Sequence, residues 1–199
     1  MSNVIPLYSE HDALTASSDS MLVAATACGD MAALGELFRR YHADVHAFLA
    51  SLSGTDDSEL DDLVQNTFLE VQKSAGRFQG RSGFRSWVFG VAANVAKHHV
   101  RSSIRRRTAF RTLALELDVR VDPGAAYEHV ERRVMLAQLM AAVEGLSYKL
   151  RVVLVMCDVE GIPGAEAAKS LGIREGTLWR RLHDARKKLN AEIERRASK

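Results

Sequence analysis

Hydrophobic residues in the first half of the chain recur at three- and four-residue steps, the spacing of one face of an α-helix. A stripe from Leu34 to Leu52 predicts a helix that ends at Gly54. A second stripe, residues 60–71, predicts a helix that ends at Gly76. A third helix is expected to begin at Phe84 and to continue into an arginine cluster. The alternation typical of β-strands does not occur in this half of the sequence.

The pattern weakens after Thr108, and Asp122-Pro123-Gly124 is typical of a turn or linker. Further apolar stripes then predict helices over residues 134–143, 150–156 and 165–171 and a long helix from about Glu175. We therefore expect an all-α fold, with two small helical domains joined by a flexible linker. The expected boundaries are a mobile tail at 1–18, a first domain at 19–107, the linker at 108–127 and a second domain at 128–197.

Charge is strongly segregated although the net charge is only +2. Residues 71–115 contain ten basic and no acidic side chains, and residues 174–199 contain nine basic and four acidic ones. Two such zones favour contact with a polyanion at two places. No apolar run reaches the roughly 18 residues of a membrane helix, and the N-terminus lacks a signal-peptide pattern. We expect a cytoplasmic protein with no membrane insertion.

The segment from Gly164 to Leu182 has the layout of a helix-turn-helix. Ala168 provides the small residue where the two helices cross, and Gly172 tolerates positive φ in the turn. The N-terminal half of the second helix would then enter the major groove of DNA, while later basic residues reach phosphates. The exposed candidates are Thr177, Trp179, Arg180, Arg181, Asp184, Arg186, Lys187 and Lys188.

An enzyme or a metal protein fits the sequence less well. His42 and His46 have the spacing of a zinc pair, but no third ligand lies near them in the sequence. The carboxylates fall on helix faces, and no serine is placed beside a base. We expect no catalytic residues, no metal and no cofactor.

Two sets of motifs make the sequence resemble the extracytoplasmic-function (ECF) sigma factors. Residues 166–189 resemble their region 4, through Glu166-Ala167-Ala168, Leu171-Gly172-Ile173 and Gly176-Thr177-Leu178. Asp62-Leu63-Val64-Gln65 and Phe84-Arg85-Ser86-Trp87 resemble their region 2. The resemblance implies that the first domain is sigma region 2 and the second is region 4. It covers nearly all of residues 19–197.

The family resemblance also implies roles for single residues. The partners that it implies are core RNA polymerase, through the β′ clamp and the β subunit, and double- and single-stranded promoter DNA. An anti-sigma factor stays an open possibility. The polymerase-binding residues implied are Asp61, Asp62, Gln65 and Asn66. The residues implied for the −10 element are Arg77, Phe78, Phe84, Trp87, Asn94, Lys97, Arg101 and Arg105. Those for the −35 element are Thr177, Trp179, Arg180, Arg181, Arg186 and Lys187.

Some alternatives stay open at this point. Trp87 lies on an apolar stripe, so packing in the core competes with stacking on a base. His98, Asp184 and Trp179 depart from the usual family residues, which leaves the promoter bases undefined. A stand-alone helix-turn-helix regulator is the second candidate function, but it would not explain the Asp-Leu-Val-Gln helix or the acid-free zone.

Overall fold

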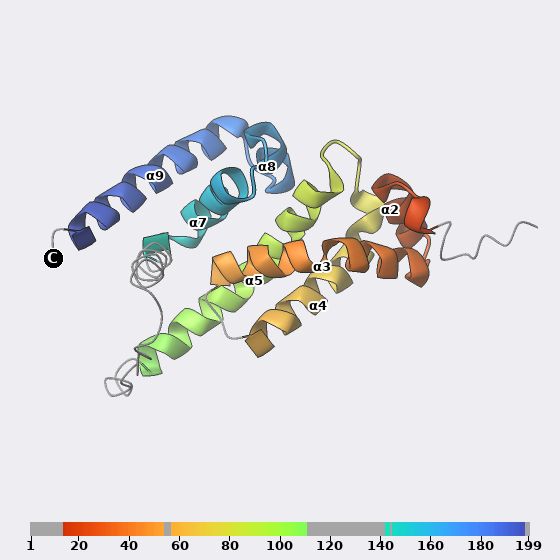
Figure 1. Ribbon diagram of the computed structural model, residues 1–199, viewed down its shortest axis with the longest axis horizontal. Helices are drawn as coiled ribbons and strands as arrows, with labels where there is room; N and C mark the ends of the chain where they lie inside the picture. Colours follow the sequence, from red (N-terminus) through yellow and green to blue (C-terminus); the bar gives the residue numbers. More distant parts are fainter. Residues whose placement is uncertain (1–13, 54–56, 111–141, 144, 198–199) are drawn as a thin grey trace, which may run out of the picture.

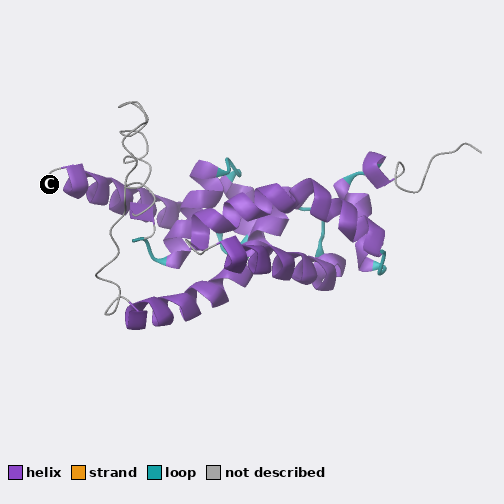
Figure 2. Ribbon diagram, turned by 60° about the horizontal axis from the view of Figure 1, so that its bottom comes forward, coloured by secondary structure: helices purple, strands orange, loops and turns teal. Residues whose placement is uncertain are grey.

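The computed structural model describes residues 14–53, 57–110, 142–143 and 145–197, and within them every regular element is helical (Figures 1 and 2). The first domain contains α2 (Asp19–Ala27), α3 (Met31–Ser53), α4 (Asp57–Ser74), the 3-10 turn η1 (Ala75–Arg77) and α5 (Phe84–Phe110). The second contains α7 (Tyr148–Leu154), the π-helical turn η2 (Val155–Val159), α8 (Gly164–Ser170) and α9 (Glu175–Ala197). The all-α prediction is confirmed. None of the described helices is long and apolar enough to span a membrane.

Helix α3 is the centre of the first domain and packs against α2, α4 and α5. The rings of Phe48 on α3 and Phe89 on α5 stack with their centroids 4.4 Å apart, and both side chains are fully buried. The stripe predicted between residues 34 and 52 accordingly faces the core. Phe38 is the exception, because it lies at the edge of the stripe, 37% exposed, with its ring edge-on to Phe68.

Residues 14–18, the end of the segment expected to be a tail, contact the first domain. Arg40 on α3 donates hydrogen bonds to the backbone carbonyl oxygens of Leu14 (3.1 Å) and Thr15 (2.9 Å). Ser18 begins α2 by accepting a hydrogen bond from the backbone N–H of Met21. Residues 14–18 are therefore held on the first domain, since α3 supplies donors for their backbone. Residues 1–13 lie outside the described residues.

The second domain is a helix-turn-helix in which α7 and α8 pack against α9. Gly172 has φ of +63°, the left-handed conformation predicted for this turn. The backbone N–H of Ile173 donates to Ala168 O, and that of Gly172 donates to Lys169 O, which together terminate α8. Leu178, Leu182 and Ala185 then bury one face of α9.

The two domains pack against each other, which the sequence did not lead us to expect. Helix α8 lies on α5, and α7 and η2 lie on α3 (Figure 1). Their buried side chains join into one hydrophobic cluster. The expected linker, residues 108–127, lies outside the described residues except for 108–110, which complete α5.

Glu36 makes the first domain sensitive to acid. Its side chain is 4% exposed, and hydrogen bonds from Arg39 and Arg40 lower the pKa of this carboxyl from 4.5 to about 2. Because the pKa is lower in the folded chain, this stabilisation is present above pH 4.5 and is lost as pH falls toward 2.

We expect Glu36→Gln to lower the melting temperature at pH 7 by a few degrees. The loss of melting temperature between pH 4.5 and pH 2 should also be smaller than in the unmodified chain. Thermal unfolding followed by circular dichroism measures both effects, with Glu194→Gln on α9 as the control. Identical pH profiles for Glu36→Gln and the unmodified chain would contradict the assignment.

Candidate functional site

One face of α4 presents polar side chains to solvent. Asp61, Asp62, Gln65 and Asn66 are all exposed, whereas the neighbouring Leu63, Val64, Thr67 and Phe68 are buried. The Asp61 carboxylate lies 3.9 Å from Nε2 of His46 on α3. The structure thus places the four residues predicted to bind polymerase together on one accessible surface, which we call the α4 face.

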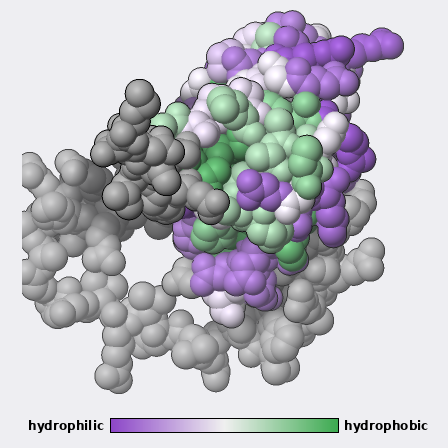
Figure 3. Space-filling view, turned by 90° about the vertical axis from the view of Figure 1, so that its right-hand side faces the viewer, coloured by the Kyte–Doolittle hydropathy of each residue, from purple (hydrophilic) through white to green (hydrophobic). Residues whose placement is uncertain are grey.

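Hydrophobic side chains adjoin these polar residues. Leu69, one turn after Gln65 and Asn66, is 50% exposed, and Met21, Met31 and Phe38 of the same domain are exposed as well. Hydrophobic residues gather on the end of the molecule where α2 lies (Figure 3). Exposed apolar area of this kind marks surfaces that bind other macromolecules.

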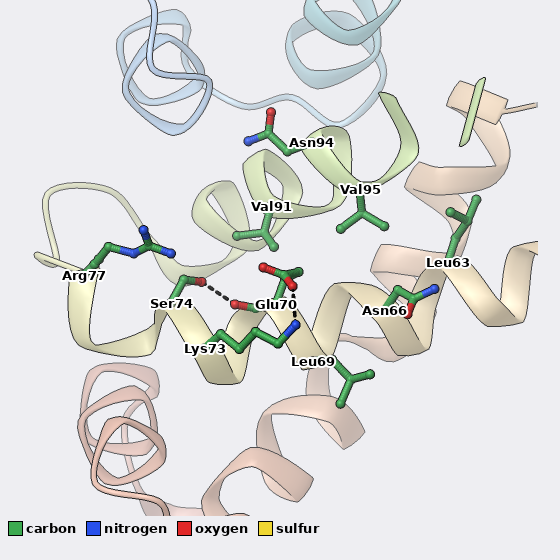
Figure 4. A pocket seen from close by; sticks show the side chains of 10 residues that line it. All are labelled: Leu63, Asn66, Leu69, Glu70, Lys73, Ser74, Arg77, Val91, Asn94 and Val95. Atoms are coloured by element: carbon green, nitrogen blue, oxygen red, sulfur yellow. Dashed lines mark hydrogen bonds and ion pairs between the residues drawn. The ribbon is translucent and has the colours of Figure 1, made fainter. Parts of the chain in front are cut away.

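A groove of about 770 Å³ runs between α4 and α5 (Figure 4). Asn66, Lys73 and Arg77 line one side, and Val91, Asn94 and Val95 line the other. The Lys73 ammonium lies 2.6 Å from the Glu70 carboxylate, so its charge is partly neutralised. Arg77 and Asn94, predicted to bind the −10 element, therefore share one groove with Asn66, predicted to bind polymerase.

Three aromatic residues predicted for the −10 element form one cluster. The Phe78 ring centroid lies 5.1 Å from that of Trp87 and 6.2 Å from that of Phe84. Phe84 is buried, while Trp87 and Phe78 are partly exposed and pack against the core. Phe84 is thus a core residue. Phe78 and Trp87, in contrast, have accessible ring surface on which an unstacked base could lie.

The recognition helix α9 exposes fewer free cations than its sequence suggests. Arg180 and Lys187 are exposed, and Thr177 and Arg181 are partly buried. Arg186 instead donates two hydrogen bonds to the Asp158 carboxylate of η2, at 2.9 and 2.6 Å. In this conformation Arg186 is ion-paired with a carboxylate and is not available to bind a phosphate.

Trp179 is held between its own helix and the start of α8. Its Nε1 donates to Glu175 Oε1 at 3.2 Å, and its ring packs against Gly164. Half of the side chain is still exposed. The ring therefore lies beside the N-terminal half of α9, where base edges would come within reach.

Three residues of α5 that the sequence singled out have side chains outside the described part of the structure. Arg101 and Arg105 lie on α5, but their side chains, like that of His98, are outside the described residues. Among the side chains that are described, no group of three or more His, Cys, Asp and Glu is arranged to hold a metal ion. His42 instead packs against Phe38, with ring centroids 4.8 Å apart.

Several polar residues that hold the two domains together were missed from the sequence. Arg85 pairs with Asp44 of its own domain at 2.8 Å and with Glu160 of the other at 2.6 Å. Ser86 donates to Glu166 at 2.7 Å. The partners lie 75 and 80 residues further along the chain, so helical periodicity carries no signal for them.

Comparison with known proteins identifies the family. Residues 37–107 match the family model of sigma-70 region 2, and residues 136–189 match that of sigma-70 region 4. The chain belongs to the ECF RNA polymerase sigma factors, which direct RNA polymerase to promoters. A stand-alone helix-turn-helix regulator is disfavoured, because it would contain no region 2.

Curated relatives cover most of the chain. The ECF RNA polymerase sigma factor SigM of Mycobacterium tuberculosis is 31% identical over 175 residues, covering 86% of this chain and 83% of SigM. CnrH of Cupriavidus metallidurans is 29% identical over 182 residues, covering 89% and 95% of the two chains. The structure of CnrH in complex with the cytosolic domain of CnrY superposes with a TM-score of 0.64 at 25% identity, covering 89% of this chain and 98% of CnrH.

The fold also resembles that of the sigma factor RpoE from Bartonella quintana, solved with the anti-sigma factor NepR. The TM-score is 0.57 at 20% identity, and the match covers 80% of this chain and 96% of that chain. At 20% identity, this match shows a similar helical fold and nothing more.

Breaking the Asp158–Arg186 ion pair should change the affinity for DNA. Asp158→Asn removes the carboxylate that occupies Arg186, so the guanidinium becomes available to a phosphate. We expect the affinity of the holoenzyme for promoter DNA to rise by about two- to fivefold and its salt dependence to steepen by about one phosphate contact. Glu194→Gln, the same charge change near the end of α9, is the control. Equal affinities for Asp158→Asn and Glu194→Gln would exclude Arg186 as a DNA contact.

Proposed function

We propose that this sigma factor binds core RNA polymerase through the α4 face, formed by Asp61, Asp62, Gln65 and Asn66. The observation that carries the proposal is the joint exposure of these four side chains beside Leu69. Carboxylates and amides around an apolar residue can pair with basic groups of a partner while the apolar area is buried. In the family this helix docks on the β′ clamp.

The same domain would hold the melted −10 element. Single-stranded DNA is bound by a cationic groove beside aromatic side chains that stack on bases. Arg77 and Asn94 lie in the groove between α4 and α5, and Phe78 and Trp87 lie beside Arg77 and Arg81. Lys97, one turn after Asn94, extends the basic surface along α5. We assign Arg101 and Arg105 to the same surface from the sequence alone.

The second domain would read the −35 element with α9. Thr177, Trp179 and Arg180 lie in the N-terminal half of the helix, which approaches base edges in the major groove. Lys187 lies two turns further and would contact phosphate. The protein would thus act by binding polymerase and DNA in the cytoplasm, without catalysis or a cofactor.

An anti-sigma factor is a further proposed partner. The two solved sigma factors that this chain resembles are both complexes, CnrH with the cytosolic domain of CnrY and RpoE with NepR. The exposed hydrophobic side chains of the first domain would suit a protein partner of this kind.

The polymerase-binding proposal is tested by reversing charge on the α4 face. Asp61→Lys combined with Asp62→Lys should weaken binding to core polymerase at least tenfold, because the reversed charges repel the basic partner surface. Both side chains are exposed, so circular dichroism should show an unchanged fold.

A matched control makes the same change in net charge elsewhere. Glu192→Lys combined with Glu194→Lys alters two acids near the end of α9. Binding is measured by fluorescence anisotropy of labelled sigma factor titrated with core polymerase. If both double variants bind core equally well, the α4 face is not the polymerase contact.

Two substitutions on α9 distinguish base reading from phosphate binding at the −35 element. Arg180→Ala should cost about 1–3 kcal/mol on the preferred sequence and relax the preference at one base position. Lys187→Ala should weaken every sequence by a similar factor, because phosphate contacts carry no sequence information. The measurement is holoenzyme binding to a panel of single-base −35 substitutions. A uniform loss with Arg180→Ala would assign it to phosphate and leave Thr177 or Trp179 as the base-reading residue.

A further inference from the structure

Trp179, on the helix proposed to read the −35 element, has its side chain held on two sides. Its Nε1 donates a hydrogen bond to Oε1 of Glu175, one turn earlier on α9, at 3.2 Å. On the other side, the six-membered part of the indole lies against Gly164, the first residue of α8. Half of the residue is still exposed to solvent. The indole is therefore fixed in position without being buried.

Glycine at position 164 makes room for the indole. A Cβ atom at this position would lie 2.5 Å from Cζ2 and 2.8 Å from Cη2 of Trp179. Gly164 does not have a positive φ, so its backbone conformation is open to other residues. The close approach of the indole is therefore what requires glycine here.

The segment that contains Gly164 is itself anchored to the second domain. Ile162, 6% exposed, donates its backbone N–H to Met156 O at 2.9 Å. The carbonyl oxygen of Pro163 accepts from the backbone N–H of Ala167 at 2.9 Å, and the proline ring restricts φ at position 163. The backbone against which the indole packs is thus rigid, and the ring is pre-organised.

The exposed part of the ring belongs to the face of α9 that points away from the core. Leu178 and Leu182 are buried and define the core side of the helix. Glu175, Trp179 and His183 follow one another at four-residue steps, which places them on one face, and all three are exposed. They lie in the N-terminal half of α9, the part of a recognition helix that approaches base edges in the major groove.

The hydrogen bonding of the indole determines what it can recognise. Tryptophan has one donor, Nε1–H, and no acceptor. In Trp179 this donor is bonded to Glu175, so the surface left for DNA is apolar carbon. Among the groups that base edges present in the major groove, the 5-methyl group of thymine is the apolar one.

We propose that Trp179 recognises a thymine of the −35 element by packing its indole against the 5-methyl group. This inference rests on the proposed reading of the −35 element by α9, and it adds the base and the chemical group that are read. Glu175 and Gly164 are positioning residues, because they hold the ring from two sides. A ring that is already fixed loses little side-chain entropy on binding, so most of the contact contributes to affinity.

Replacing thymine by deoxyuridine removes this methyl group and leaves every hydrogen-bonding group of the base in place. A −35 element is first selected from a randomised promoter library with the unmodified holoenzyme. Each thymine of the selected element, on both strands, is then replaced in turn, and holoenzyme binding is measured by fluorescence anisotropy. One replacement should weaken binding about three- to fivefold, the value of burying one methyl group. The same replacement should leave the affinity of Trp179→Ala holoenzyme unchanged.

Gly164→Ala should lose most of the same discrimination, because the added Cβ displaces the indole while Trp179 is retained. Ile193→Ala, at another exposed apolar residue of α9 about four turns later, is the control for Trp179→Ala. Gly35→Ala, where a Cβ meets nothing within 4 Å, is the control for Gly164→Ala. Both controls should discriminate as the unmodified chain does.

The ratio of the affinities for thymine and deoxyuridine is taken within each protein. A variant that is partly unfolded lowers both affinities alike, so its ratio does not change. A purely structural role of Trp179 would therefore leave the ratio the same in Trp179→Ala as in the unmodified chain.

Methylated cytosine gives the reverse test at the same base position. With the unmodified holoenzyme, 5-methylcytosine should bind about three- to fivefold more tightly than cytosine, because the methyl group is restored. With Trp179→Ala, the two bases should bind equally.

The outcomes separate this inference from the proposed function. Binding that depends on the −35 sequence but falls at no thymine, or falls equally with Trp179→Ala, would overturn the thymine contact and leave the proposed function intact. Full discrimination by Gly164→Ala would overturn the positioning role of Gly164. Binding that does not depend on the −35 sequence at all would refute the proposed reading by α9, and the thymine contact with it.

Discussion

The relation between the two domains depends on the contact of α5 with the end of α8 at Gly90. No side chain fits between the helix and the backbone of Ser170, so the two elements come within reach of each other's polar groups. Arg85 and Ser86 lie about one turn earlier on α5, and from there they reach Glu160 and Glu166. One turn of one helix therefore sets how the second domain is oriented on the first.

The helices themselves could be predicted because their causes are local. Apolar spacing defined α3 and α4, and the expected starts at Phe84 and Glu175 are where α5 and α9 begin. The polar face of α4 followed from the same periodicity. The contacts between the domains could not be predicted, because Arg85 and Gly90 meet partners about 75 to 80 residues away. The contacts of Leu14 and Thr15 could not be predicted for a similar reason: Arg40 binds their carbonyl oxygens from about 25 residues later in the chain.

Charge in the sequence differs from charge available for binding. The acid-free stretch predicted contact with a polyanion, yet Arg85 within it is neutralised by Asp44 and Glu160. Arg186 on α9 is likewise paired with Asp158. Among the described cations, Arg77 lies in the groove between α4 and α5, and Arg180 and Lys187 are exposed on α9. The number of cations available to DNA is thus smaller than the residue counts imply.

The π-helical turn η2 and the residue after it provide the carboxylates that pair with Arg186 and Arg85. Its wider winding, with the N–H of Glu160 bonded to Val155 O, directs Asp158 to Arg186 and Glu160 to Arg85. Removing one residue here would restore an ordinary α-helix and rotate everything beyond it by about 100°. Both carboxylates would then miss their partners. The turn should consequently tolerate exchanges of its apolar residues in evolution far better than any change of its length.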